Sequence, residues 1–385
     1  MRMTQLKTIA DIQTGPFGSQ LHKEDYVETG TPIVTVEHLG NRVFTEQNLP
    51  RVSDSDKARL IKYTLSTGDI VFSRVGSVDR CSYVDKSHDG WMFSGRCLRV
   101  RPTELVDSLY LYYYFCLEET KQFVRNIAVG ATMPSINTKL LGEVEIALPD
   151  LNNQKRIAAV LSSLDDKIEN NQKLNDNLQQ QAMALYAEMF LNSSDNNVTS
   201  GTLSDIAAIT MGQSPSGSSY NEDGVGEVFY QGRAEFGFRF PKRRLFTTEP
   251  KRMAETGDVL LSVRAPVGDL NVAYERCCIG RGLGAIHSKT GHSSFVLYTM
   301  FALRSQLDVF NGEGTVFGSI NRDALNAIPI DIPPVTEIDQ FEAVAHPIDE
   351  LIRANYEENC RLEAIRDSLL PKLMSGEIDA SAVNL

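Results

Sequence analysis

The chain has 385 residues, more than one typical domain, and this length favours two or three domains. Its hydrophobic content of 42% and charged content of 23% are ordinary for a globular protein, and no apolar run approaches the roughly 18 residues of a membrane span. The net charge of −12 argues at first against nucleic acid, but residues 334–385 alone hold 11 Asp and Glu against 4 Lys and Arg, so the remainder is nearly neutral and can carry a basic face.

Cysteine usage and the N-terminus bear on the compartment. The six cysteines form no CxxC pair and no regular spacing, so neither a disulfide framework nor a metal site is expected. The first ten residues alternate polar and apolar side chains and lack the apolar core of a signal peptide. We expect reduced thiols and a cytoplasmic protein.

In chain order, two strand-rich segments each precede a long helical segment. Short β-branched or aromatic runs at 32–36, 69–73 and 259–263 are bounded by Gly and Pro and predict strands, and one helix is expected over 108–125 and another over 293–310. The fold class is therefore α+β. The expected segments are a first domain (1–150), a first long helix (151–191), a linker (192–200), a second domain (201–333), a second long helix (334–376) and a loosely ordered tail (377–385).

The sequence contains an internal repeat. Ser135-Ile136-Asn137 recurs as Ser319-Ile320-Asn321, an offset of 184, which holds without a gap through both helical segments. Upstream the offset drifts to 189, at Thr67-Gly68-Asp69-Ile70 and Thr256-Gly257-Asp258-Val259, and then to 197 near Leu6. The helical parts thus share one frame and the globular loops have diverged, and loops on a shared scaffold often carry recognition.

Both helical segments show heptad spacing of apolar residues, interrupted at the same two positions in each copy. Asn171 and Asn175 interrupt the first, and Asn355 and Asn359 the second. A buried Asn commonly sets register, so we predict that the helices pair with each other, antiparallel, and that these four residues set the register. The alternative is that each helix packs on its own domain. Pro347 predicts a kink or a new helix start.

A helix of 37 residues without Gly or Pro, from Gln154 to Phe190, would be about 55 Å long at 1.5 Å per residue. We interpret the helical segments as a spacer between two recognition domains.

Candidate contact residues lie in polar, glycine-containing loops. Residues 15–20 and 212–217 are expected to follow the first strand of each copy, with glycines that permit close approach of a partner and Ser and Gln that offer donors and acceptors. A plain glycine-rich turn is the alternative. Residues 239–252 hold six basic residues and one acidic residue among aromatic ones, which suits phosphate contact; a solvated charged hairpin is the alternative.

Arg74 and Arg264 follow the paired strands, each near a glycine, and this repetition favours a shared role. The candidates for DNA contact are Phe17, Gly18, Ser19, Gln20, Arg74, Ser77, Gln213, Ser214, Arg233, Lys242, Arg243, Arg244 and Arg264.

The sequence contains none of the catalytic motifs considered for a nucleotide-binding, hydrolase or methyltransferase site. The chain lacks a Walker A loop and a Gly-x-Ser-x-Gly elbow, and the Pro-Pro of 331–335 lacks the flanking residues of a base methyltransferase. Asp165-Asp166-Lys167 imitates part of a nuclease pattern but lies in the heptad segment. His287 and His292 have the wrong spacing for one helical face and no acidic neighbour in sequence. We predict no catalytic residue and no cofactor in this chain.

The two-fold chain, the Thr-Gly-Asp and Ser-Ile-Asn elements, the loop at 15–20 and the Pro149-to-helix boundary together resemble the specificity subunits of Type I restriction-modification systems, over essentially the whole chain. That resemblance implies two target recognition domains, each reading half of a bipartite, asymmetric DNA sequence, and an antiparallel coiled coil that sets the gap. It also implies double-stranded DNA, two methyltransferase subunits and restriction-translocase subunits as partners. S-adenosylmethionine, ATP and Mg would belong to those partners. Within the second helix, 345–347 and Arg366 depart from the heptad pattern.

Three other functions remain open on the sequence. The chain could be the DNA-recognition subunit of a methylation-only system, which neighbouring genes would distinguish. It could be a non-DNA protein adaptor, which salt-dependent DNA binding would argue against. A fused methyltransferase would need a cofactor motif that the sequence does not contain.

Overall fold

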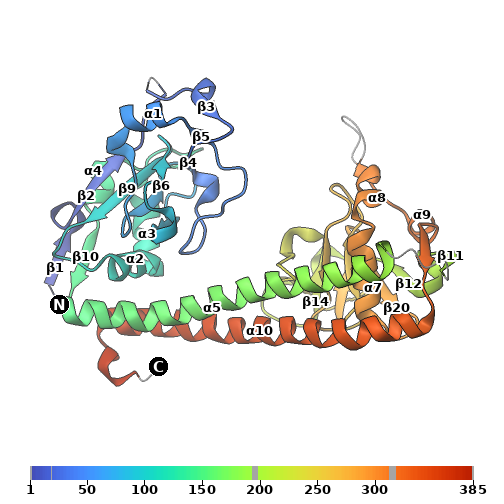
Figure 1. Cartoon of the computed structure of the whole chain (residues 1–385). Coiled ribbons are helices and arrows are strands. Elements are labelled where there is room, and N and C mark those ends of the chain that lie inside the picture. Colours follow the sequence, from blue (N-terminus) through green and yellow to red (C-terminus); the bar gives the residue numbers. More distant parts are fainter. Residues whose placement is uncertain (1, 19, 193–197, 312–317, 384–385) are drawn as a thin grey trace. The chain divides into compact units, whose positions relative to one another are not determined.

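A computed structural model describes residues 2–18, 20–192, 198–311 and 318–383 (Figure 1). The chain divides into two compact units: unit 1 combines Met1–Glu169 with Asn359–Leu385, and unit 2 is Asn170–Glu358. Each long helix begins in one unit and ends in the other.

Among its described residues, unit 1 forms two four-stranded sheets and a two-stranded ladder. One sheet has the order β2-β9-β6-β7 and is antiparallel throughout, and the other has the order β3-β5-β4-β8, with β4 and β8 parallel. β1 pairs with β10 and joins the two ends of the globular part. The strands are β1 Arg2–Gln5, β2 Ala10–Thr14, β3 Tyr26–Val27, β4 Thr31–Val34, β5 Arg51–Val52, β6 Ile70–Ser73, β7 Cys81–Tyr83, β8 Met92–Phe93, β9 Cys97–Pro102 and β10 Glu145–Leu148.

Unit 2 has the same topology with one additional strand, β16, in its second sheet. Its described residues form the sheet β12-β20-β17-β18, the sheet β13-β15-β14-β19-β16 and the ladder β11-β21, and β14 pairs in parallel with β19 as β4 does with β8. The strands are β11 Thr199–Thr202, β12 Ala207–Met211, β13 Tyr220–Asn221, β14 Glu227–Tyr230, β15 Phe246–Thr247, β16 Met253–Ala254, β17 Val259–Ser262, β18 Leu270–Val272, β19 Cys277–Ile279, β20 Leu283–Ser288 and β21 Pro329–Ile332.

Short helices pack against these sheets in both units. The single helix expected over 108–125 is two helices, because the chain turns into an extended conformation at Leu117 (ψ 133°). The helix expected over 293–310 is likewise divided. The short helices are α1 Asp54–Arg59, α2 Ser108–Cys116, α3 Glu118–Ile127, α4 Thr138–Gly142, α6 Leu203–Ile206, α7 Ser293–Ala302, α8 Arg304–Asp308 and α9 Arg322–Asn326.

Both short motifs of the repeat have a structural explanation. In the Thr-Gly-Asp turns, Gly68 and Gly257 have φ values of +94° and +88°, which favour glycine, and the following aspartate accepts the N–H that begins the turn, at 2.8 Å in each copy. In the Ser-Ile-Asn elements the isoleucine is buried and the asparagine caps α4 or α9, each at 2.9 Å.

The long helices are α5, Leu151–Tyr186, which continues as a π-helical turn at Ala187–Leu191, and α10, Val335–Ser375. α10 begins well before Pro347 and runs through it, so the expectation of a new helix start there was wrong. None of the described helices is long and apolar enough to cross a membrane.

The predicted antiparallel pairing of the long helices is confirmed inside each unit. In unit 1 the early part of α5 meets the late part of α10, where Arg366 pairs with Asp165 at 2.7 Å. In unit 2 the late part of α5 meets the early part of α10, where the rings of Tyr186 and Phe341 lie 5.5 Å apart. Within each unit, Figure 1 shows the segments of α5 and α10 side by side.

The end of the chain is more ordered than expected. Ile378 N–H donates to the Lys372 carbonyl at 3.1 Å, and Ala380 opens a 3-10 turn and is buried in the core of unit 1. The segment therefore packs on unit 1 over its described residues.

Candidate functional site

The loops singled out in the sequence follow β2 and β12, the second strand of each unit rather than the first. Their first glycines serve the fold: a Cβ on Gly15 would lie 2.1 Å from the Ser94 carbonyl oxygen, and one on Gly212 would lie 2.1 Å from that of Gly280. These glycines thus allow the close approach of the protein's own chain, whereas Gly18 has open space around it. Ser19 lies outside the described residues.

Matching backbone hydrogen bonds show which loop positions correspond in the two units. Gly15 N–H donates to the Cys97 carbonyl as Gly212 N–H does to that of Leu283, at 3.2 and 2.9 Å. Two further pairs of bonds define the correspondence. Arg74 N–H donates to the Arg96 carbonyl as Val263 N–H does to that of Gly282. Ser94 N–H donates to the Val34 carbonyl as Gly280 N–H does to that of Tyr230. The corresponding positions are therefore Phe17 and Ser214, Thr35 and Gln231, Arg74 and Val263, Val75 and Arg264, Gly95 and Arg281, and Arg96 and Gly282.

This correspondence corrects one interpretation. The sequence predicts a shared role for Arg74 and Arg264 as repeated residues, but Arg264 corresponds to Val75, and Arg74 corresponds to Val263. The two arginines lie on equivalent loops of the two units but one position apart, so their side chains extend from different points of the scaffold.

In unit 1 these loops form a surface that we call loop face 1, defined by Phe17, Arg74 and Arg96. The Arg74 guanidinium donates to the Gly95 carbonyl at 2.9 Å and lies 5.6 Å from the centre of the Phe17 ring. Phe17 is 55% exposed although it is a large apolar side chain. Arg96 is exposed and has no acidic partner among the residues the structure describes. The face combines an exposed aromatic ring with cations that are not neutralised.

The equivalent surface of unit 2, loop face 2, is defined by Ser214, Gln231, Arg264 and Arg281. Ser214 Oγ accepts from Gln231 Nε2 at 3.0 Å and from Arg281 N–H at 3.2 Å. Arg264 and Arg281 are exposed, and neither pairs with a carboxylate within the described ranges. The same scaffold thus presents an aromatic ring in one unit and an amide and a hydroxyl in the other.

The other predicted contact residues differ in their exposure and in whether their side chains already have a partner within the protein. Gln20 is held, because its Oε1 accepts from Tyr63 Oη at 2.7 Å. Ser77 and Gln213 are exposed on loops of units 1 and 2. Arg233 is half exposed and pairs with Asp269, which also lies 3.5 Å from Arg304.

The basic stretch 239–252 is less available than its composition suggests. Arg243 pairs with Glu275, and Arg244 with Glu235 at 2.5 Å. Arg239 is buried. Lys242 is exposed and has no carboxylate partner among the described residues. Three of the six basic residues in this stretch, Arg239, Arg243 and Arg244, are therefore balanced by carboxylates of unit 2.

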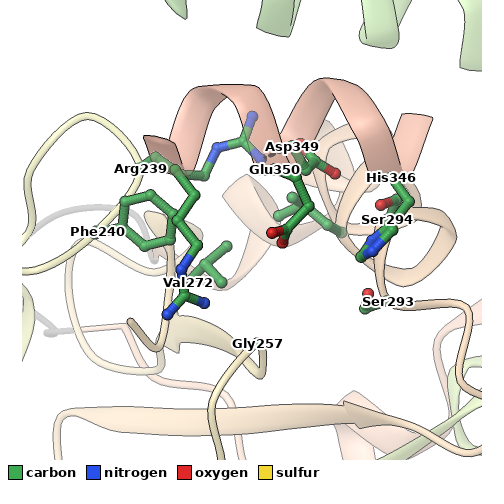
Figure 2. A pocket seen from close by; sticks show the side chains of 11 residues that line it. Arg239, Phe240, Gly257, Val272, Ser293, Ser294, His346, Asp349 and Glu350 are labelled. Carbon is green, nitrogen blue, oxygen red and sulfur yellow. Dashed lines mark hydrogen bonds and ion pairs between the residues drawn. The ribbon is translucent and has the colours of Figure 1, made fainter. Parts of the chain in front are cut away.

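Arg239 belongs to a group of a tyrosine, an aspartate and an arginine that fixes a long helix to its unit. We call this group the helix clamp, and both units contain one. In unit 2, Arg239 Nη1 pairs with Asp349 of α10 at 2.6 Å, and Tyr298 Oη donates to the same carboxylate at 2.9 Å. Figure 2 shows Arg239 together with Asp349 and His346, both of α10, among the residues that line a cavity of about 70 Å³. Because Arg239 and Asp349 already pair with each other, we assign the cavity no chemistry.

The clamp of unit 1 uses the equivalent tyrosine and aspartate with a different cation. Tyr113 Oη donates to Asp165 of α5 at 2.6 Å, and Arg366 of α10 supplies the ion pair. Arg42 is the counterpart of Arg239, because its carbonyl accepts from Tyr83 N–H as that of Arg239 does from Val272 N–H, and Arg42 pairs with Asp166 at 2.6 Å instead. Burial and the neighbouring Asp165 raise the pKa of Tyr113, so its hydroxyl stays protonated and donates. The aspartates of the nuclease-like pattern are thus engaged in structural contacts.

The four asparagines are buried, as a register role requires. Asn355 Nδ2 donates to Asn175 Oδ1 at 2.8 Å, and Asn171 Nδ2 donates to Glu358 Oε2 at 2.7 Å, across the helix pair of unit 2. Asn359 lies in unit 1. That these residues set the register stays a prediction.

Both histidines have acidic partners, which the sequence reasoning missed. His287 Nδ1 lies 2.6 Å from Asp258 Oδ1, and His292 Nε2 lies 2.8 Å from Asp339 Oδ1. Asp258 ends the Thr-Gly-Asp turn, and in unit 1 its counterpart Asp69 pairs with Arg101. The His287–Asp258 pair therefore braces a turn, and the His292–Asp339 pair ties the start of α7 to α10. The described residues contain no group of three His, Cys, Asp or Glu that could hold a metal ion.

The chain is similar to a known protein family, to individual relatives and to a solved structure. The family model described as the Type I restriction modification DNA specificity domain matches residues 1–180 and 196–357. A specificity subunit named for type I restriction enzyme MjaX of Methanocaldococcus jannaschii is 29% identical, over 97% of this chain and 92% of its own length. The MjaIX specificity subunit of the same organism is 25% identical, over 72% of this chain and 70% of its own.

A solved structure is similar in fold. The S subunit of a type I restriction-modification system from M. genitalium aligns with a TM-score of 0.58 at 18% identity, over 97% of this chain and 95% of that one. At this identity the similarity supports the architecture alone.

Proposed function

Because the chain belongs to the family of Type I restriction-modification DNA specificity domains, we propose that it is a recognition subunit that reads a bipartite, asymmetric DNA target. Each loop face would read one half-site. The observation that carries this proposal is the repeated scaffold with different side chains at equivalent loop positions. A true repeat of side chains would favour two identical half-sites, whereas Phe17 against Ser214 and Thr35 against Gln231 favour two different ones.

The charges of the loop faces support DNA as the partner. Guanidinium groups without a carboxylate partner are free to bind phosphates, which supply most of the affinity, and side chains on base edges supply specificity. Arg96 in loop face 1 and Arg264 and Arg281 in loop face 2 meet the first condition. A net charge of −12 does not oppose this, because the acidic excess is concentrated in residues 334–385.

We further propose that α5 and α10 act as the spacer and as the docking scaffold. Two methyltransferase subunits and restriction-translocase subunits would assemble on them, and S-adenosylmethionine, ATP and Mg would bind to those partners. This chain would have no catalytic role: the carboxylates that imitate a nuclease pattern, Asp165 and Asp166, are held in ion pairs with Arg366 and Arg42.

Adenine methylation mapped across the genome tests the proposal. Cells with and without this gene are compared, and we expect methylation to disappear at one motif made of two short, different blocks separated by an unspecified gap. An unchanged pattern, or loss at a single uninterrupted or palindromic motif, would contradict it. Pull-down of the full chain would identify the methyltransferase and restriction subunits by mass, and a methyltransferase without restriction subunits would indicate a methylation-only system.

A further inference from the structure

Gln231 is an exposed side chain of loop face 2 whose backbone is closely packed against the β19–β20 turn. Gly280 N–H donates to the Tyr230 carbonyl at 2.8 Å, and Gly282 N–H donates to the Gln231 carbonyl at 3.2 Å. A Cβ on Gly280 would lie 2.9 Å from Gln231 Cα, and one on Gly282 would lie 2.8 Å from Gln231 O. The residue after β14 therefore rests directly on the β19–β20 turn, which only glycine permits at such distances.

The amide of Gln231 is also oriented. Its Nε2 donates to Ser214 Oγ at 3.0 Å, and its Oε1 lies 3.5 Å from Tyr220 Oη. The Ser214 oxygen is held in turn by Arg281 N–H at 3.2 Å. A fixed rotamer loses little conformational entropy when it binds, so a held glutamine discriminates better than a mobile one.

One N–H of this amide and the remaining lone pairs of Oε1 are left for a partner. A glutamine amide presents a donor beside an acceptor, the arrangement that matches N7 and N6 of adenine in the major groove. Neither guanine nor cytosine matches this pair, because guanine offers two acceptors and cytosine a single donor.

Arg264 and Arg281 lie on the two loops that flank this amide. Arg281 is in the turn that holds Ser214, and Arg264 follows Val263, whose N–H donates to the Gly282 carbonyl at 2.9 Å. Both arginines are exposed and lack carboxylate partners within the described residues, so they can take phosphates on either side of a base pair.

We propose that Gln231 reads an adenine in the half-site bound by unit 2, and that Arg281 and Arg264 anchor the DNA backbone beside it. This inference rests on the proposed function. Loop face 1 cannot make the same contact, because its equivalent residue Thr35 has no amide and its hydroxyl is 2.9 Å from His38 Nδ1. The adenine contact would therefore belong to one half-site only.

The test is selection of duplexes from a random-sequence library by the full chain assembled with its methyltransferase, for the wild type and for Gln231→Ala. We expect the variant to lose discrimination at one A·T pair of one half-site by about 5- to 140-fold, the range of one bidentate contact, with every other position kept. Gln47→Ala, an exposed glutamine of unit 1, should leave the consensus unchanged.

Two further variants separate base reading from backbone anchoring. Gln231→Glu keeps the shape but loses the donor, so it should lose the same adenine preference. Arg281→Ala should weaken all duplexes about equally and lower the slope of affinity against salt by about one. An unchanged consensus with Gln231→Ala, or a loss at a G·C pair, would overturn the inference. A wild type that selects no sequence would instead overturn the proposed function.

Discussion

The clamp of unit 1 makes a quantitative prediction about Asp165→Ala. The carboxylate is 9% exposed and holds both the Tyr113 hydroxyl, at 2.6 Å, and Arg366, at 2.7 Å. Its loss leaves a buried hydroxyl without an acceptor, worth about 1–3 kcal/mol, and removing one partner of a buried ion pair costs about 3–5 kcal/mol. Because Arg366 is 24% exposed and keeps Asp367 at 2.8 Å, we expect the lower end, about 3 kcal/mol.

The assay is urea denaturation followed by circular dichroism, with the free energy of unfolding extrapolated to water. Asp367→Ala is the matched control, because it removes the other carboxylate that pairs with Arg366. The Asp367 side chain is 66% exposed, and exposed ion pairs contribute about 0–1 kcal/mol. If the two variants lose the same small amount of stability, the clamp does not hold the helix and this reasoning is refuted.

The remaining predictions concern the helix seam and the turns. Asn175→Leu and Asn355→Leu should each cost about 1–3 kcal/mol because the other amide is left unpaired, and the double variant should cost clearly less than their sum; additive losses in denaturation would contradict the contact. Gly15→Ala should lower the thermal midpoint sharply or prevent folding, since its Cβ would meet a backbone oxygen at 2.1 Å, whereas Gly18→Ala should melt like the wild type. Asn321→Ala removes the cap of α9 and should cost about 1 kcal/mol, a value that the same denaturation series would measure.

The architecture was largely predictable from the sequence because both copies of the internal repeat contain the same helix-forming pattern and the same turn and cap residues. The ungapped offset through both helical segments indicated a common helical frame, and Asn175 and Asn355 do meet across the pair. The α+β class followed from short strand runs. Breaks such as Leu117 were missed, since a single residue that leaves the helical conformation has no compositional signature.

The candidate site was predicted only in part, because its electrostatics depend on contacts between residues far apart in sequence. The stretch 239–252 looked basic, but Glu275, 32 residues beyond Arg243, balances one of its charges. Gln231 and Arg281 were missed, since a lone polar residue resembles any surface residue.

Lengthening the helix pair tests the central claim most directly. One helical turn is inserted at matched points of α5 and α10, and the adenine-methylation motif is mapped in cells that carry the variant. If two loop faces read separate half-sites and the helices set the gap, both blocks of the motif stay unchanged and only the gap between them changes length. A motif that keeps its original gap, or one whose blocks change sequence, would contradict the account.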